Sequence, residues 1–150
     1  QGVSSAASDV YKRQIELGGI RLRLFAPGGA GDENERCLMA LVSAGGYDML
    51  VTGDGSKSAE QELIKNHDIS GVELLIAGHH GSRYSCGGDF LRAIGGETAV
   101  VSTGYNTFGH PTYETLERLH AYGYTILRTD LNGTIEIRIG KDYGQEKQQR

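Results

Sequence analysis

Short apolar runs that end directly in polar, metal-binding residue types restrict how this chain can fold more than any other feature. The run 72–77 has one charged side chain among six residues, and the run 98–102 is similarly apolar. A strand with so little polar content is buried on both faces, which is typical of parallel strands covered by helices. Stretches with helical signals separate the runs, so the sequence predicts an α/β fold with layered packing.

The other predicted elements follow from periodicity and turn signals. Glycines at 45 and 46 join two apolar runs in a hairpin, and Ser58 with Gln61 has the form of a capping box at a helix start. Residues 130–133 predict the turn of a terminal hairpin, and Arg128, Thr129 and Asp130 are interpreted as a strand end and turn. The predicted strands are 20–25, 37–42, 47–52, 72–77, 98–102, 124–128 and 134–139, and the predicted helices are 59–66, 89–94 and 111–123.

Charge and composition narrow the functional classes. The net charge of −4 and the isoelectric point of about 5.7 give no overall basic field that would attract nucleic acid. An enzyme whose metal ions supply local positive charge is still compatible with this balance. The 150 residues suit one domain, and no apolar run approaches the ~18 residues of a membrane span, which predicts a soluble piece. Cys37 and Cys86 match no zinc-ligand spacing and are interpreted as free thiols.

Polar side chains follow three of the predicted strands. Asp54, the pair His79 and His80, and the segment 105–110 each come directly after one of them. In open α/β sheets, ligands bind outside the carboxyl ends of the strands, and carboxylate and imidazole are groups that hold Zn²⁺ or Mn²⁺. The pattern predicts a metal site. The simpler alternatives are a turn-capping role for Asp54 and a hydrogen-bonded structural role for the two histidines.

Five motifs occur in order along about residues 20–140. They are Leu50-Val51-Thr52-Gly53-Asp54, Ala59-Glu60-Gln61-Glu62-Leu63, Gly78-His79-His80-Gly81-Ser82-Arg83-Tyr84-Ser85, Gly104-Tyr105-Asn106-Thr107-Phe108-Gly109-His110-Pro111 and Leu127-Arg128-Thr129-Asp130-Leu131-Asn132-Gly133. Together they resemble the metallo-β-lactamase fold, and in particular the C-terminal domain of ComEC-type DNA internalization proteins of bacterial competence. The resemblance implies an αββα sandwich with two divalent metal ions, Zn or Mn, at one edge of the sheets.

The same resemblance implies roles for catalytic, metal-binding residues. Asp54 would bridge the two metals and His79 would be the last histidine ligand, with His80 as the alternative. The family's first motif, of the form His-x-His-x-Asp-His, has no counterpart here, because no histidine precedes His67. The prediction is therefore a partial domain that lacks its N-terminal portion, binds metal weakly or not at all and has little activity as it stands.

Residues near the predicted metal site are assigned to substrate binding. Arg83 and Ser82 suit phosphate oxygens, and Tyr84, Tyr105 and Phe108 suit stacking on single-stranded bases. His110 has two interpretations, an active-site group or a residue that caps the following helix. The full set is Ser82, Arg83, Tyr84, Tyr105, Asn106 and His110.

The function implied by the resemblance is hydrolysis of phosphodiesters by a water that two metals activate. The intact parent would be a nuclease that degrades one DNA strand during DNA uptake in transformation. It would act on single-stranded DNA and be tethered through a channel domain of the same chain to the cytoplasmic membrane, on its extracellular or periplasmic side, with no obligate protein partner. The alternatives are a non-catalytic module that guides DNA and a stand-alone hydrolase of small esters or phosphodiesters.

The predicted organisation has three parts. Residues 1–14 are polar and without period, and they are interpreted either as a non-native leader translated from adapter sequence or as an ordinary flexible terminus. Residues 15–140 form the partial metallo-β-lactamase-like domain. Residues 141–150 are predicted to be a flexible tail.

Overall fold

Among the described residues, seven strands form one sheet in which each strand lies beside its neighbours in the sequence. The computed structural model describes residues 13–26 and 36–139. The strands are β1 Arg13–Leu17, β2 Ile20–Phe25, β3 Met39–Ala44, β4 Tyr47–Val51, β5 Leu74–Ile76, β6 Thr98–Val101 and β7 Thr125–Arg128. The helices are α1 Lys57–Asn66, the 3₁₀ turn η2 Gly78–Gly81, α2 Gly88–Ile94, α3 Tyr113–Ala121 and α4 Thr129–Asn132.

The sheet changes from antiparallel to parallel at β4. Strands β1 to β4 form an antiparallel meander, and its turn between β3 and β4 contains Gly45 and Gly46 at φ +57° and +82°. Two residues with positive φ suit the tight turns that match strand twist. From β4 onward the pairs are parallel, because α1, α2 and α3 return the chain to the same end of the sheet.

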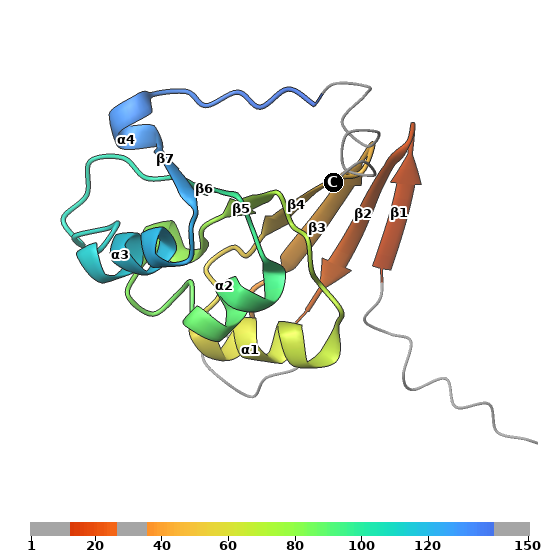
Figure 1. Ribbon diagram of the computed structural model, residues 1–150, viewed down its shortest axis with the longest axis horizontal. Coiled ribbons are helices and arrows are strands. Elements are labelled where there is room, and N and C mark those ends of the chain that lie inside the picture. The colour runs from red at the N-terminus through yellow and green to blue at the C-terminus, as the bar shows by residue number, and fades with distance from the viewer. Residues whose placement is uncertain (1–12, 27–35, 140–150) are drawn as a thin grey trace, which may run out of the picture.

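The helices α1, α2 and α3 lie on one side of the sheet (Figure 1). On that side a row of directly paired residues runs across the central strands, through Leu41, Leu50, Leu75 and Ala99. Each of these side chains is at most 1% exposed. This row and the helix residues packed on it form the hydrophobic core.

The opposite face of the sheet is also apolar. A second row of paired residues contains Ala40, Val51, Ile76, Val100 and Leu127. All but Val100 are only half-buried, and α1 to α3 lie on the other side (Figure 1). Both faces of the central strands are thus apolar, as their low polar content predicts, although only one face carries these helices.

Most of the predicted elements are confirmed, with two corrections. The strand 20–25 and the helix 59–66 correspond to β2 and α1, but the helix cap is Ser56, whose Oγ accepts a hydrogen bond from the Ala59 amide, and not Ser58. The terminal hairpin is wrong, because residues 134–139 form no strand in the described structure.

The physical reason lies in the turn expected at residues 130–133. Residues Thr129–Asn132 wind into one helical turn, α4, and the Asn132 side chain accepts a hydrogen bond from the Arg128 amide at 2.9 Å. The Arg128 amide therefore has its hydrogen-bond partner within the α4 turn, where β7 ends. The chain then leaves through Gly133, and Ile137 is 39% exposed beyond it.

Strand β1 was not among the predicted elements, and it begins at Arg13, within the segment 1–14. The rest of that segment, 1–12, and all of the predicted tail, residues 141–150, lie outside the described residues. The result is a mixed α/β fold with one sheet; the second sheet of a metallo-β-lactamase sandwich stays a prediction. No helix in the described part of the chain has the length and apolarity needed to cross a membrane.

Candidate functional site

Three loops meet at the carboxyl ends of the parallel strands. The loop after β4 contacts η2 through a hydrogen bond from the His79 amide to the Gly53 carbonyl, at 2.9 Å. The loop after β6 contacts η2 through the His80 ring, whose Nδ1 lies 2.7 Å from the Ser102 carbonyl. The structure therefore brings the histidine pair between the loops that carry Asp54 and His110.

Both histidines have left-handed backbone conformations. His79 has φ 49° and ψ 42°, and His80 has φ 54° and ψ 28°. For residues with a Cβ this region costs on the order of 1 kcal/mol each, and two such residues in succession are uncommon. Strain of this kind persists where the surroundings enforce it, and it is concentrated at functional sites.

The ring of His80 is oriented by the sheet. A carbonyl oxygen can only accept, so the 2.7 Å contact with Ser102 places the proton of His80 on Nδ1. In the neutral ring the other nitrogen, Nε2, then carries the free lone pair, on a side chain that is exposed. Metal-binding histidines have this arrangement, in which a backbone carbonyl holds one ring nitrogen and the metal takes the other.

The ring of His79 lies instead against His110. The centroids of the His79 and His110 rings are 5.6 Å apart in a T-shaped arrangement. The Phe108 ring stacks on the His110 ring, with 6.2 Å between their centroids. The Nδ1 atom of His110 is buried and has no hydrogen-bond partner among the described residues. Burial, together with the nearby His79, His80 and Arg83, lowers the pKa of His110.

The donors at these loops do not complete a metal centre by themselves. Asp54 is exposed on the turn after β4, next in sequence to Gly53, whose carbonyl accepts the His79 amide hydrogen bond. In the part of the chain that the structure describes, no three His, Cys, Asp or Glu residues gather closely enough to hold a metal ion. A catalytic zinc has about three protein ligands, so the residues present do not fit a complete site.

The residues assigned to substrate binding divide into exposed and enclosed ones. Arg83 is exposed, and Tyr84 and Tyr105 are 67% and 100% exposed. Ser82 is 2% exposed, and its Oγ accepts a hydrogen bond from the Tyr84 amide at 3.3 Å. Asn106 is half-buried, and its side-chain amide bonds to its own loop.

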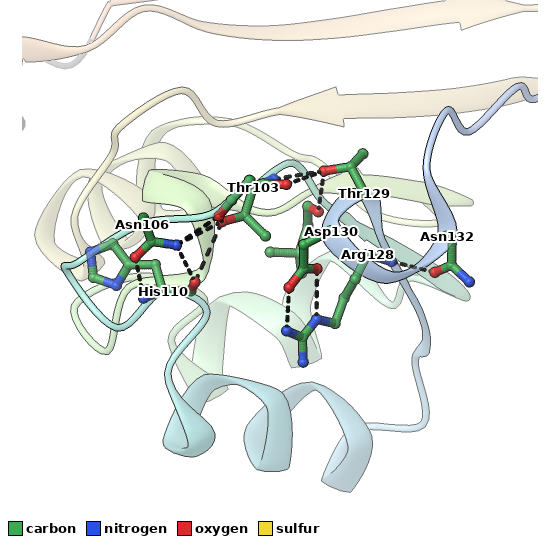
Figure 2. Close-up of polar contacts among 9 residues, drawn as sticks. Thr103, Asn106, His110, Arg128, Thr129, Asp130 and Asn132 are labelled. Atoms are coloured by element: carbon green, nitrogen blue, oxygen red, sulfur yellow. Dashed lines mark hydrogen bonds and ion pairs between the residues drawn. The ribbon is translucent and has the colours of Figure 1, made fainter.

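That loop is part of a polar network at the ends of β6 and β7 (Figure 2). The Asn106 side chain donates to the His110 carbonyl at 2.7 Å and accepts from the His110 amide at 3.0 Å. The Thr129 hydroxyl accepts from the Thr103 amide at 2.8 Å and donates to the Thr103 carbonyl at 2.6 Å. Both ends of the loop are therefore held by side chains.

The amino-acid sequence of this chain was compared with those of known proteins. The chain is similar to a segment of bacterial competence proteins. It is 40% identical to Competence protein ComA of Neisseria gonorrhoeae over 121 residues, and these aligned residues cover 79% of this chain and 17% of that protein. It is 36% identical over 113 residues to ComE operon protein 3 of Bacillus subtilis, with 75% and 15% covered.

Recombination protein 2 of Haemophilus influenzae is 28% identical over 136 residues, with 88% of this chain and 17% of that protein covered. The chain thus spans about a sixth of the length of the curated relatives it matches. No family model matches it.

Sequence reasoning missed the side chains that hold in place residues 78–87, which we call the histidine loop. Glu60 on α1 is fully buried, and its carboxylate accepts hydrogen bonds from the Cys86 and Gly87 amides at 2.7 and 2.8 Å. Arg118 on α3 donates to the Cys86 and Ser85 carbonyls at 2.6 and 3.0 Å. Glu60 stands in a motif that was noted only for resemblance, and a helical glutamate gives no local signal that it is buried.

Proposed function

We propose that the chain supplies part of a metal-dependent hydrolase domain that degrades a DNA strand during DNA uptake in bacterial competence. The observation that carries this proposal is the pair of consecutive left-handed histidines, held between the loops of Asp54 and His110. Strain of this kind has no evident use for folding. The relatives named for competence supply the biological setting, and the catalytic role is our inference.

Asp54 and one histidine of the pair are the proposed metal ligands. The Nδ1 contact with the Ser102 carbonyl favours His80, which presents its Nε2 outward. The resemblance favours His79, which lies against His110. Since these donors do not complete a centre, the remaining ligands have to come from a segment beyond the described residues.

The side chains around this edge suit single-stranded DNA. Tyr84, Tyr105 and Phe108 are at least 67% exposed, and Arg83, next to Tyr84 in the sequence, is exposed too. Exposed aromatic rings stack on unpaired bases with about 1–3 kcal/mol per base, and the Arg83 guanidinium suits a phosphate. Stacking on these aromatic rings and the positive charge of Arg83 would therefore bind DNA, although the chain as a whole has a net negative charge.

The apolar sheet face opposite α1 to α3 supports the partial sandwich. The half-buried row through Ala40, Val51, Ile76 and Leu127 crosses five strands together with the buried Val100. Apolar area of this kind is normally covered in α/β proteins. A second sheet from outside the described residues would cover it.

The test measures degradation of single-stranded DNA with Mn²⁺. It compares this chain with an N-terminally extended protein that carries the His-x-His-x-Asp-His motif. We expect degradation by the extended protein only, and a loss of at least ~100-fold in its Asp54→Ala variant, since even outer-shell partners of a metal contribute 10- to 100-fold.

The exposed Asp68 provides the matched control, because Asp68→Ala also removes a surface carboxylate. Equal rates in the Asp54→Ala and Asp68→Ala proteins would overturn the catalytic role. DNA binding without any degradation would instead favour the non-catalytic module. Hydrolysis of small esters in preference to DNA would favour the stand-alone hydrolase.

A further inference from the structure

We propose that Asn106 and Thr129 are positioning residues that hold His110 against His79, so that the end of β7 takes part in the site. This inference rests on the proposed function, in which the loop of His110 lies beside the proposed ligand histidines. It assigns Asn106 to the loop rather than to the substrate. It also gives a role to Thr129, which the sequence indicated only as part of a turn.

Asn106 fixes the end of the loop that carries His110. Its Nδ2 donates to the carbonyls of His110 and Gly104 at 2.7 and 3.0 Å, and its Oδ1 accepts from the His110 amide at 3.0 Å. One side chain thus binds both backbone polar groups of His110 (Figure 2). With its amide group used in this way, Asn106 determines where the His110 backbone lies.

Thr129 fixes the beginning of the same loop. Its hydroxyl is bonded to both backbone polar groups of Thr103, at 2.8 and 2.6 Å. The Thr103 hydroxyl in turn lies 3.3 Å from the Asn106 Nδ2, so the two contacts form one connected network. A displacement of Thr129 is therefore transmitted to the residue that holds His110.

The position of Thr129 is itself fixed by its neighbours. Arg128 donates two hydrogen bonds to the Asp130 carboxylate, at 3.0 and 2.6 Å, with each side chain only about a quarter exposed. Asn132 accepts from the Arg128 amide. These contacts hold the α4 turn on the end of β7 (Figure 2) and keep the Thr129 hydroxyl directed at the neighbouring strand.

The position of the His110 ring suggests a use beyond loop structure. Its Nδ1 is buried without a partner in the described structure, and the ring lies 5.6 Å from that of His79. A buried polar atom normally has a hydrogen-bond partner. An unpaired one beside the left-handed histidine pair is suited to a ligand that arrives there.

The test uses NMR of this chain, without metal or DNA. It measures the nuclear Overhauser contact between the His79 and His110 rings in Thr129→Val and Asn106→Ala. We expect both variants to lose this contact, while Thr129→Ser, which keeps the hydroxyl, retains it. Thr125→Val is the matched control, since Thr125 is exposed on β7, the strand that leads into Thr129, and it should retain the contact.

A second arm measures DNA degradation by the extended protein in a double-mutant cycle. Thr129→Val should lower the rate by roughly 10- to 100-fold, and it should have no further effect when His110 is already alanine. Two outcomes would overturn the inference. One is that folded Thr129→Val and Asn106→Ala proteins, with dispersed amide spectra, both keep the ring contact. The other is that the losses of rate from Thr129→Val and His110→Ala add up in the double variant. If no protein degrades DNA, the proposed function fails, and the ring contact still decides the positioning role.

Discussion

Replacing Glu60 by glutamine tests how the fold holds the histidine loop. The Glu60 carboxyl group is fully buried between α1 and the loop after η2, and it accepts hydrogen bonds from the Cys86 and Gly87 amides. Burial raises the pKa of Glu60 from 4.5 to about 7, although the two amides and the nearby Lys57 and Arg118 oppose the rise. Burial of the charge is therefore the dominant effect.

This raised pKa has a definite consequence for stability. Between pH 4.5 and 7 the folded chain holds the Glu60 proton while the unfolded chain has lost it. The free energy of unfolding then falls as the pH rises through this window, because the folded state binds more protons. A difference of about 2.5 pKa units corresponds to about 3 kcal/mol, of which about 2.5 kcal/mol is lost between pH 5 and pH 8.

Glu60→Gln removes this dependence. The glutamine amide has the shape of the protonated carboxyl group, but its NH₂ group cannot accept a hydrogen bond, so one of the two backbone amides loses its acceptor. We expect the variant to be less stable than the parent near pH 5 by about 1–3 kcal/mol, because of the lost acceptor. Between pH 5 and pH 8 the difference should shift in favour of the variant by about 2–3 kcal/mol. The assay is urea unfolding of both proteins at several pH values, which yields the free energy of unfolding from midpoint and slope.

Glu97→Gln, at an exposed position, is the control for the general effect of removing a negative charge. Its stability difference from the parent should change little over the same pH range. A stability difference between Glu60→Gln and the parent that does not vary with pH would refute the reasoning. It would mean that the two amide hydrogen bonds offset the burial of the charge.

Three further predictions concern the same region and its support. The first concerns Zn²⁺ affinity, measured by calorimetry on an N-terminally extended protein. The Ser102 contact identifies His80 as the ligand, so His80→Ala should weaken binding at least ~10-fold and His79→Ala should weaken it less. The reverse order would identify His79 as the ligand. His80→Gly should be more stable to urea than His80→Ala by about 1 kcal/mol, because only the left-handed backbone distinguishes them; equal midpoints would exclude that backbone. Tyr124→Phe should cost about 1–3 kcal/mol in thermal unfolding, since the hydroxyl accepts the Gly96 amide at 3.0 Å, and an unchanged midpoint would show that water replaces it.

The central part of the fold could be predicted because its signals are local. A run such as 72–77 has too few polar residues to lie at a surface, and it is the strand β5 with its flanking residues. Once the parallel strands are known, their carboxyl ends lie at one edge. The proximity of the Asp54 loop, the histidine pair and the 105–110 loop follows from topology, without knowledge of any side-chain contact.

The remaining features depend on partners that are distant in sequence. Residues 134–139 alternate like a strand, but a strand also needs an edge to pair with, and the Asn132 side chain closes the end of β7. Glu60 lies on a helix whose pattern does not show that two loop amides face it. The sequence also does not show that the Asn106 side chain bonds to its own loop, as asparagines in loops often do.

The polar groups buried in this chain are concentrated on the histidine loop. Glu60 and Arg118 bind its far end at Cys86, and the Ser85 hydroxyl donates to the Gly78 carbonyl at its near end, at 2.7 Å. A buried carboxylate costs about 3 kcal/mol at neutral pH, and two left-handed histidines cost on the order of 1 kcal/mol each. An apolar loop would avoid both costs. Their coincidence on one loop is what the proposed role of the two imidazoles requires, since stability of the fold alone would favour neither cost.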